Sequence, residues 1–483
     1  MRSPSSHLYE KIADEVASAI HRGALRPGDR LPSVRLMSEQ RRVSVATVLE
    51  AYRRLEDDGL IETRPKSGHF VRKQRALVLE EPRAQRTLRA PTRVSVGDGV
   101  STLLTAMRDP SVLPLGAAYP AAELLPIGAL NRMLSQLARE LSTAGATYEA
   151  PPGVLTLRRQ LARRSLTWGL SLSEDEFVIT SGAMEGLHTC LRAVTRAGDT
   201  VAVETPMYFG ILQLVEEMGL RAIEIPSLPR VGMDLDVLEE ALKSQRVHAI
   251  VSVANVNNPI GSIMPDESKE RLVKMLSRHD VPLIEDDIYG DLAFEGRPRP
   301  IKAFDREGRV LLCGSVSKTL APGYRVGWVS GGRFHDRVTR LKYTASVASA
   351  TLPQMAVAEF LGSGGYDKHL RRLRARCAAQ SNRVREAVAT YFPQGTRVSC
   401  PLGGFVLWVE MPQGVNAIDL QSRALQRGIA IAPGPIFSAR GRYQNAIRLS
   451  CGQPWSEQLD EAIRVLGELV DEQLSPNRSR RSA

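Results

Sequence analysis

The feature that most constrains this chain is a series of short apolar runs that alternate with helical stretches from about residue 100 onward. Buried parallel strands read as continuous apolar segments, and strands that alternate with helices are typical of βαβ units. The sequence therefore predicts an α/β fold with a mostly parallel sheet. The runs are EFVIT (176–180), TVAVE (200–204), HAIVSVA (248–254), VPLIE (281–285) and RVLLCG (309–314).

The chain has 483 residues, more than a single hydrophobic core usually holds, so we expect more than one domain. Its first part shows a mainly helical pattern and not the alternation of strands and helices. Residues 7–22 carry apolar side chains at helical spacing. Ser33 and Ser44 each stand where they can cap a following helix, one over residues 34–41 and one ending at Gly59. One face of that third helix is predicted to carry Val45, Val48, Leu49, Tyr52 and Leu55.

A hairpin is predicted next, because LIETRPKSGHFV (60–71) places two β-prone runs around a Pro-Lys-Ser-Gly turn. Three helices and a hairpin form a winged helix-turn-helix, in which the second motif helix enters the major groove of DNA. Its first turn exposes Ser44 and Thr47 to the bases, with Arg53 and Arg54 further along. Arg35 and the hairpin turn are placed to reach phosphates or the minor groove. The candidate DNA contacts are Arg35, Ser44, Thr47, Arg53, Lys66 and Gly68.

Charge and composition indicate which classes of binding partner the protein can have. The formal net charge is +11, and Lys and Arg outnumber Asp and Glu by 19 to 12 within residues 1–95. A basic N-terminal part favours a polyanion such as double-stranded DNA, although a solvated surface would carry the same charge. No apolar run reaches the length of a membrane span, and the five cysteines show no paired spacing. We therefore expect a cytoplasmic protein without a membrane partner, a disulfide framework or a metal.

The segment between the two patterns has the composition of a linker. Residues 73–95 carry several Arg, two Pro and little periodicity. We predict a winged helix-turn-helix over residues 5–73, a linker over 74–96, and the larger α/β domain over 97–475.

Polar side chains follow each apolar run of the α/β part, at the strand ends where open sheets bind their ligands. Ser181 and Gly182 open a helix whose free amides can hold a phosphate. Taken singly, such residues are more often structural than functional. In this order they supply what one pyridoxal 5′-phosphate molecule needs, including a lysine for a Schiff base and a carboxylate for the ring nitrogen. The other members are Tyr208, Asn258, Asp286, Asp287, Tyr289, Ser315, Ser317, Lys318 and Arg325.

Two resemblances cover nearly the whole chain. Residues 100–470 resemble a fold-type I aminotransferase of the branch that includes aminoadipate and aromatic aminotransferases, through SVSKTLAPGYRVGW (315–328). Residues 7–72 resemble the winged helix of the GntR superfamily, through LPSVRLMSEQRRVSVATVLEAYRRLEDDGLIETRPKSGHFV (31–71). Their order resembles the MocR-type regulators. The resemblance implies a large domain with a mostly parallel sheet and a small C-terminal α+β domain.

The resemblance also implies roles for single residues. Lys318 matches the Schiff-base lysine, and Asp286, rather than Asp287, matches the partner of the pyridine nitrogen. Arg448 matches the arginine that grips a substrate α-carboxylate, and Tyr148 a tyrosine that reaches the phosphate of the neighbouring subunit. The remaining matches are the phosphate ligands Ala183, Met184, Ser315, Ser317 and Arg325, the ring-hydroxyl partners Asn258 and Tyr289, and the stacking ring of Tyr208. The loop LGAAYPAAELLP (115–126) departs from relatives, because alanines stand where glycine is common.

Three functions are compatible with these features. The first is a homodimeric transcription regulator that binds paired DNA half-sites and senses pyridoxal 5′-phosphate or an amino acid or amine effector. The alternative is a working aminotransferase with an accessory DNA-binding domain. A DNA-binding protein that uses the large domain only as a scaffold ranks last, because Lys318, Asp286 and Arg325 are all present.

Overall fold

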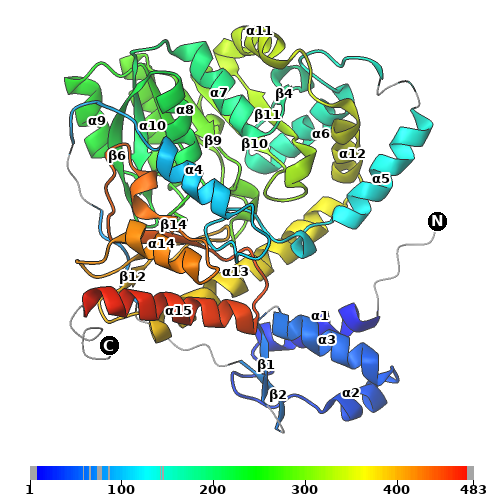
Figure 1. The fold of residues 1–483 in the computed structure, drawn as a ribbon. Coiled ribbons are helices and arrows are strands. Elements are labelled where there is room, and N and C mark those ends of the chain that lie inside the picture. Colours follow the sequence, from blue (N-terminus) through cyan, green and yellow to red (C-terminus); the bar gives the residue numbers. More distant parts are fainter. Residues whose placement is uncertain are drawn as a thin grey trace.

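The computed structural model describes residues 8–57, 59–64, 67–72, 79–84, 88–141, 143 and 146–475. A small N-terminal unit lies below a large α/β layer, and a second, smaller sheet lies between the large layer and the C-terminal helix (Figure 1). No helix among the described residues is long and apolar enough to cross a membrane.

The N-terminal unit is a winged helix, as predicted. It contains α1 (Leu8–His21), α2 (Val34–Arg41), α3 (Val45–Asp57) and an antiparallel hairpin of β1 (Ile61–Arg64) and β2 (Gly68–Val71). The Leu36 amide donates to Ser33 Oγ at 3.2 Å and the Thr47 amide donates to Ser44 Oγ at 3.1 Å, so both predicted caps are confirmed. Gly59 follows α3 with φ +70°, a left-handed conformation that ends the helix.

The predicted apolar face of α3 was partly wrong. Val48, Tyr52 and Leu55 are buried, but Val45 and Leu49 are 46% and 49% exposed. Ala51 takes the inward place, which gives the helical spacing 48, 51, 52 and 55. The core faces α1 and the hairpin, so the flank that carries the other two residues is left to solvent.

The large sheet has the strand order β3-β6-β5-β8-β9-β10-β11-β4, and β7 (Gly232–Met233) pairs with β6. All five predicted runs contain strands, and β5, β6, β8, β9 and β10 are parallel to their neighbours within this group. The strand bounds are β3 Thr92–Arg93, β4 Val178–Thr180, β5 Thr200–Thr205, β6 Arg221–Leu228, β8 Ala249–Ser252, β9 Leu283–Asp286, β10 Val310–Ser315 and β11 Gly327–Ser330.

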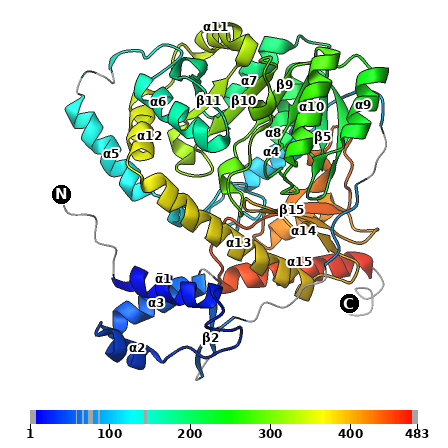
Figure 2. The ribbon, with the colours of Figure 1, turned by 180° about the vertical axis from the view of Figure 1, so that it is seen from behind.

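Strand β11 runs antiparallel to both β10 and β4. Strand β4 therefore points in the same direction as β10, and its carboxyl end lies at the same edge of the sheet. Helices pack on both faces, as expected for buried parallel strands (Figures 1 and 2). The helices of this part are α4 Gly97–Ala106, α5 Ile127–Glu140, α6 Leu155–Ser165, α7 Ala183–Val194, α8 Phe209–Glu217, α9 Leu235–Ser244, α10 Asp266–His279, α11 His335–Ser346 and α12 Thr351–Gly362. Helix α5 packs mainly against α12.

The C-terminal part is α+β, as the resemblance implied. Its antiparallel sheet has the order β12-β13-β15-β14, formed by β12 (Arg397–Val398), β13 (Val406–Glu410), β14 (Ala432–Pro433) and β15 (Ala446–Ser450). The helices are α13 (Gly365–Tyr391), α14 (Ala417–Gln426) and α15 (Glu457–Leu474). Helix α13 starts beside the large layer, passes over the winged helix and ends beside α15 (Figure 2).

The described residues of the predicted linker follow the surface of the larger part. The Val398 amide donates to the carbonyl of Glu80 at 2.9 Å, and β3 pairs with β6. Leu79 and Leu88 pack against its apolar clusters. The domain limits at residues 73 and 96 stay a prediction.

Candidate functional site

A cavity of about 160 Å³ lies at the carboxyl ends of the parallel strands. Nine of the predicted cofactor residues line it: Ala183, Met184, Tyr208, Asn258, Asp286, Tyr289, Ser317, Lys318 and Arg325. Leu187, Val253 and Ile288 complete the lining and were not predicted, because apolar side chains carry no signal that separates a cavity wall from a core. The strand directions explain why these residues lie together, because the parallel strands that precede them end at the same edge of the sheet.

Lys318 follows β10 and projects into this cavity. Its Nζ donates to the carbonyl of Ala118 at 2.5 Å and lies 5.8 Å from the centre of the Tyr289 ring. Burial, followed by the positive charge of Arg448, lowers the pKa of Lys318 to about 8. A larger fraction of neutral amine is therefore present near neutral pH than for an exposed lysine, which favours nucleophilic chemistry.

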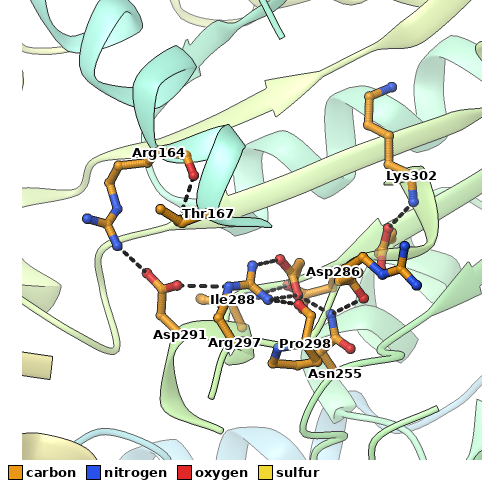
Figure 3. Close-up of polar contacts among 12 residues, drawn as sticks. Arg164, Thr167, Asn255, Asp286, Ile288, Asp291, Arg297, Pro298 and Lys302 are labelled. Atoms are coloured by element: carbon orange, nitrogen blue, oxygen red, sulfur yellow. Dashed lines mark hydrogen bonds and ion pairs between the residues drawn. The ribbon is translucent and has the colours of Figure 1, made fainter. Parts of the chain in front are cut away.

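The two consecutive acids after β9 have different surroundings. Asp287 forms an ion pair with Arg297 and accepts from Asn255 Nδ2 at 2.9 Å, whereas Asp286 forms no ion pair among the described residues and has the Lys318 amine as a nearby positive charge. In Figure 3, Arg297 contacts Asp291, and the same guanidinium also pairs with Asp287. Burial raises the pKa of Asp286 to about 7. The geometry therefore leaves Asp286, the predicted acid, available to a ligand in the cavity.

The start of α7 and Arg325 form a cradle for an anion. Gly182 has φ +81°, and a Cβ at this position would collide with the Arg325 guanidinium. Nη2 of Arg325 donates to the Ser181 carbonyl at 2.9 Å, and the first free amides of α7 belong to Ala183 and Met184. A guanidinium beside free helix amides suits a phosphate.

Ser181, Ser315 and Tyr148 do not line this cavity. Ser315 Oγ donates to the Val326 carbonyl at 2.8 Å and accepts from the Ser317 amide at 3.0 Å, so it orients the turn that carries Ser317. Ser181 Oγ lies 3.4 Å from Ser349 Oγ. Tyr148 is 84% exposed.

Arg448 lies on β15, fully buried next to the cavity. Its Nη1 donates to Asn258 Oδ1 at 3.2 Å, its Nη2 donates to the Gly116 carbonyl, and its Nε is buried without a partner. Among the described residues no carboxylate pairs with Arg448, and burial lowers its pKa. An unpaired buried guanidinium is costly, so the position suits a ligand carboxylate.

The predicted DNA contacts lie on the winged helix. Arg35, Ser44 and Arg53 are exposed and Thr47 is half-buried, with its Oγ1 2.8 Å from Ser44 Oγ. Gly68 begins β2 with φ +105°, and Lys66 lies outside the described residues.

Arg54 was wrongly placed among the groove contacts. It pairs with Asp14 at 3.0 Å and lies 3.9 Å from Glu10, both on α1. It therefore faces α1 instead of the reading surface.

The chain matches two families. Residues 122–466 match the family described as aminotransferase class I and II, whose members in general depend on pyridoxal 5′-phosphate, and residues 8–71 match bacterial regulatory proteins of the gntR family. The uncharacterized HTH-type transcriptional regulator YjiR of Escherichia coli K12 is 39% identical over 96% of this chain and 98% of its own. The 2-aminoadipate transaminase of Thermus thermophilus is 30% identical over 76% of this chain and 92% of its own.

Among solved structures, the α-aminoadipate aminotransferase LysN of Thermus thermophilus, complexed with N-(5′-phosphopyridoxyl)-L-leucine, has a TM-score of 0.72 and 29% identity over 79% of this chain and 98% of its own. The multiple substrate aminotransferase of Thermococcus profundus also has a TM-score of 0.72, with 27% identity over 78% of this chain and 95% of its own. The chain therefore belongs to the MocR-type regulators, in which a GntR-family winged helix is fused to a domain of the aminotransferase class I and II family.

Proposed function

We propose that this protein is a DNA-binding transcription regulator whose aminotransferase-like part binds pyridoxal 5′-phosphate and responds to an amino acid or amine. The observation that carries the proposal is that one helix, α13, contacts both the segment of Lys318 and the winged helix. A structural change caused by a ligand in the cavity can therefore be transmitted through α13 to the winged helix.

The first end of α13 holds the residue that follows Lys318. His369 Nε2 lies 2.6 Å from the Thr319 carbonyl oxygen. The Tyr366 hydroxyl lies 3.0 Å from Thr319 Oγ1 and donates to Asp291 at 2.8 Å. Any movement of the lysine-bearing turn therefore changes contacts made by this helix.

Further along, α13 supports the winged helix, beginning with Arg372, which lies 3.5 Å from Glu10 of α1. Glu386 pairs with Arg72 at the end of the wing, and Arg383 Nη1 donates to the Glu56 carbonyl at 3.3 Å. A Cβ on Gly59 would lie 3.3 Å from Cβ of Ala379, so the backbones are close. A helix of 27 residues spans about 40 Å.

The cavity supplies donors that fit the cofactor. Arg325 and the amides of α7 would hold its phosphate, Asp286 would hold its ring nitrogen, and Asn258 and Tyr289 would contact its ring hydroxyl. Bound there, the cofactor supplies an aldehyde for amines and an electron-withdrawing ring. Asp286, whose pKa is raised to about 7 by burial, would gain a cationic partner that favours its ionised form.

An amino-compound effector would place its carboxylate at Arg448, whose Nε lacks a partner. Such a ligand changes the contacts of Asn258, since this amide already accepts from Arg448 at 3.2 Å. An effector that binds two arrangements unequally shifts their populations, and α13 would carry the difference to the winged helix.

We also propose a homodimer that reads paired half-sites in a cytoplasmic setting. An exposed Tyr148 fits a residue that completes the site of a second copy, and two winged helices on one dimer favour two half-sites.

The second candidate is a working aminotransferase, favoured by the near-neutral pKa of Lys318 and the unpaired Arg448. A visible-absorbance titration of the cofactor-loaded full chain with amino acids and amines, with keto-acid and aldehyde products assayed in the same samples, separates the two. A spectral change with altered DNA affinity and no sustained product supports the regulator. Sustained product with unchanged DNA affinity contradicts it and supports the enzyme.

A further inference from the structure

A second cavity, of about 520 Å³, lies between the winged helix and α13, away from the site of Lys318. Its walls come from α1, the end of α3, the turn after it and the end of the wing on one side, and from α13 on the other. Six cationic side chains line it: Arg54, Arg72, Lys368, Arg371, Arg372 and Arg376. Asp14 and Glu386 are the carboxylates in the lining.

The cavity exists because α13 presents small residues at its centre. Ala375, Ala378 and Ala379 form the floor on the helix side, at the spacing of one helical face. The basic side chains of α13 lie toward its N-terminal end, and Asn382 adds an amide further along the same face. Short side chains here leave room that long side chains would fill.

The nearby carboxylates neutralise only part of this charge. Arg72 pairs with Glu386, Arg54 with Asp14, and Arg372 lies 3.5 Å from Glu10. Within the described part of the chain, Lys368 and Arg371 are exposed to the cavity and form no ion pair. Like charges held this close repel one another unless an anion enters between them.

We propose that this cavity binds a small polyvalent oxyanion, with two or more phosphate or carboxylate groups, and that the anion bridges the winged helix to α13. The volume falls within the range of small-molecule sites, about 300–1,000 Å³. Guanidinium groups bind phosphate and carboxylate through paired hydrogen bonds. Arg54 on one wall and Lys368 and Arg371 on the other would then share one ligand. Arg54 lies 3.9 Å and Arg372 lies 3.5 Å from Glu10, so the two walls approach each other at this end of α13.

The place of the cavity argues against the DNA backbone as its occupant. Ser44 and Thr47 mark the end of α3 that is predicted to read DNA, whereas Arg54 enters the cavity about 10–15 Å further along the helix. Helix α13 closes the other side.

Isothermal titration of the cofactor-loaded full chain with inorganic triphosphate, citrate and orthophosphate tests the proposal. We expect saturable binding of one triphosphate or one citrate per chain, and at least about tenfold weaker binding of orthophosphate. The double variant Lys368→Ala with Arg371→Ala should lose at least about tenfold in affinity for the polyvalent probes. The charge-retaining variant Lys368→Arg with Arg371→Lys should keep most of it.

The matched control is Lys274→Ala with Arg340→Ala, which removes the same charges from exposed positions on α10 and α11. It should bind the probes like the parent chain. Equal loss in both double alanine variants, or no saturable binding by the parent, overturns the proposal. An unchanged cofactor absorbance spectrum during titration excludes binding at the Lys318 site.

A duplex-binding assay on the same variants shows whether the basic residues bind the DNA backbone instead of a small anion. If the double variant at Lys368 and Arg371 binds duplex DNA more weakly but keeps its triphosphate affinity, the basic residues form a phosphodiester surface and the proposal is wrong. Retained DNA affinity with lost triphosphate binding supports it.

Discussion

At the scale of single residues, the cavity depends on one amine. Replacing Lys318 with Ala should abolish the visible absorbance band of the bound cofactor, because its Nζ is the amine that projects among the other lining groups. The spectrum is recorded after dialysis of the loaded protein. Lys274→Ala, on the exposed side of α10, should keep the band. A band that survives in Lys318→Ala would refute the central assignment.

Asp286 should make the cofactor-free protein less stable as the pH rises. Burial raises its pKa in the folded chain to about 7 from 3.8, so the folded state holds a proton that the unfolded state has lost. The stabilising contribution is complete below the unfolded pKa and is lost as the pH rises to about 7. Replacing Asp286 with Asn should remove this contribution to the pH dependence.

Urea unfolding of both cofactor-free proteins at about pH 5 and about pH 8 measures the effect. Burial also raises the pKa of Glu285 to about 7, so both proteins keep a second contribution of the same sign. The difference between the two proteins in how the free energy of unfolding changes with pH therefore isolates the contribution of Asp286. An identical change in unfolding free energy for the two proteins would contradict the prediction.

Arg35 should contribute to DNA affinity through the phosphates. Arg35 is exposed at the start of α2. Loss of one phosphate contact should weaken binding to all DNA sequences and reduce the slope of log affinity against log salt concentration by about one. Fluorescence anisotropy with a duplex at several salt concentrations measures both. Arg340→Ala on α11 is the control with equal charge loss. Unchanged affinity in Arg35→Ala would place the contact elsewhere.

Individual residues were predictable where a side chain had a distinctive chemistry. Lys318, Asp286 and Tyr208 follow apolar runs, and the sheet brings such positions together. The acceptor of Lys318 is the Ala118 carbonyl, which a sequence cannot mark, because every residue has a carbonyl. Arg54 was misplaced because its spacing on α3 does not reveal the carboxylates of α1.

At the scale of elements, strong apolar periodicity was a good guide and weak periodicity was not. The five predicted runs and the two capped helices are present. Strand β6 was missed because Glu224 and Pro226 interrupt its apolar pattern. Strand β11 was missed because Trp328 and Val329 are its only large apolar residues, between a glycine and a serine. The contacts of α13 with the winged helix depend on tertiary docking between distant segments, which no local pattern encodes.

The element that should couple the two parts is α13. Replacing Tyr366 with Phe removes the hydroxyl that contacts Thr319 Oγ1 at 3.0 Å and Asp291 at 2.8 Å. We expect the cofactor spectrum to stay and the effect of the amino compound on DNA affinity to fall by at least about threefold, a loss of at least about 0.6 kcal/mol in coupling. Anisotropy with and without the amino compound measures it.

Tyr391 supplies the matched control on the same helix. Its hydroxyl also donates to a carboxylate, Asp460, at 2.9 Å, but it lies at the far end from Thr319. Tyr391→Phe should keep the response of DNA affinity to the amino compound. Equal losses in both variants would mean that general stability, and not the contact with Thr319, controls the response.

At the scale of the whole molecule, the pose of the winged helix should depend on the pair between Arg72 and Glu386. Both side chains are mostly buried, at 19% and 18% exposure, so reversal of either charge places like charges together away from water. Arg72→Glu alone and Glu386→Arg alone should each release the winged helix and enlarge the radius of gyration. The double exchange should restore the compact arrangement, because it restores an ion pair with the opposite polarity.

Small-angle X-ray scattering of the cofactor-loaded parent, the two single variants and the double exchange completes this cycle. Circular dichroism of each variant shows that both folded parts are intact. If the single variants keep the radius of gyration of the parent, the pair does not hold the pose. If the single variants expand and the double exchange contracts again, the pair between Arg72 and Glu386 holds the winged helix in place. The same four proteins then show whether a docked winged helix is needed for DNA affinity to respond to an amino compound. A response that persists in the expanded variants would separate docking from sensing.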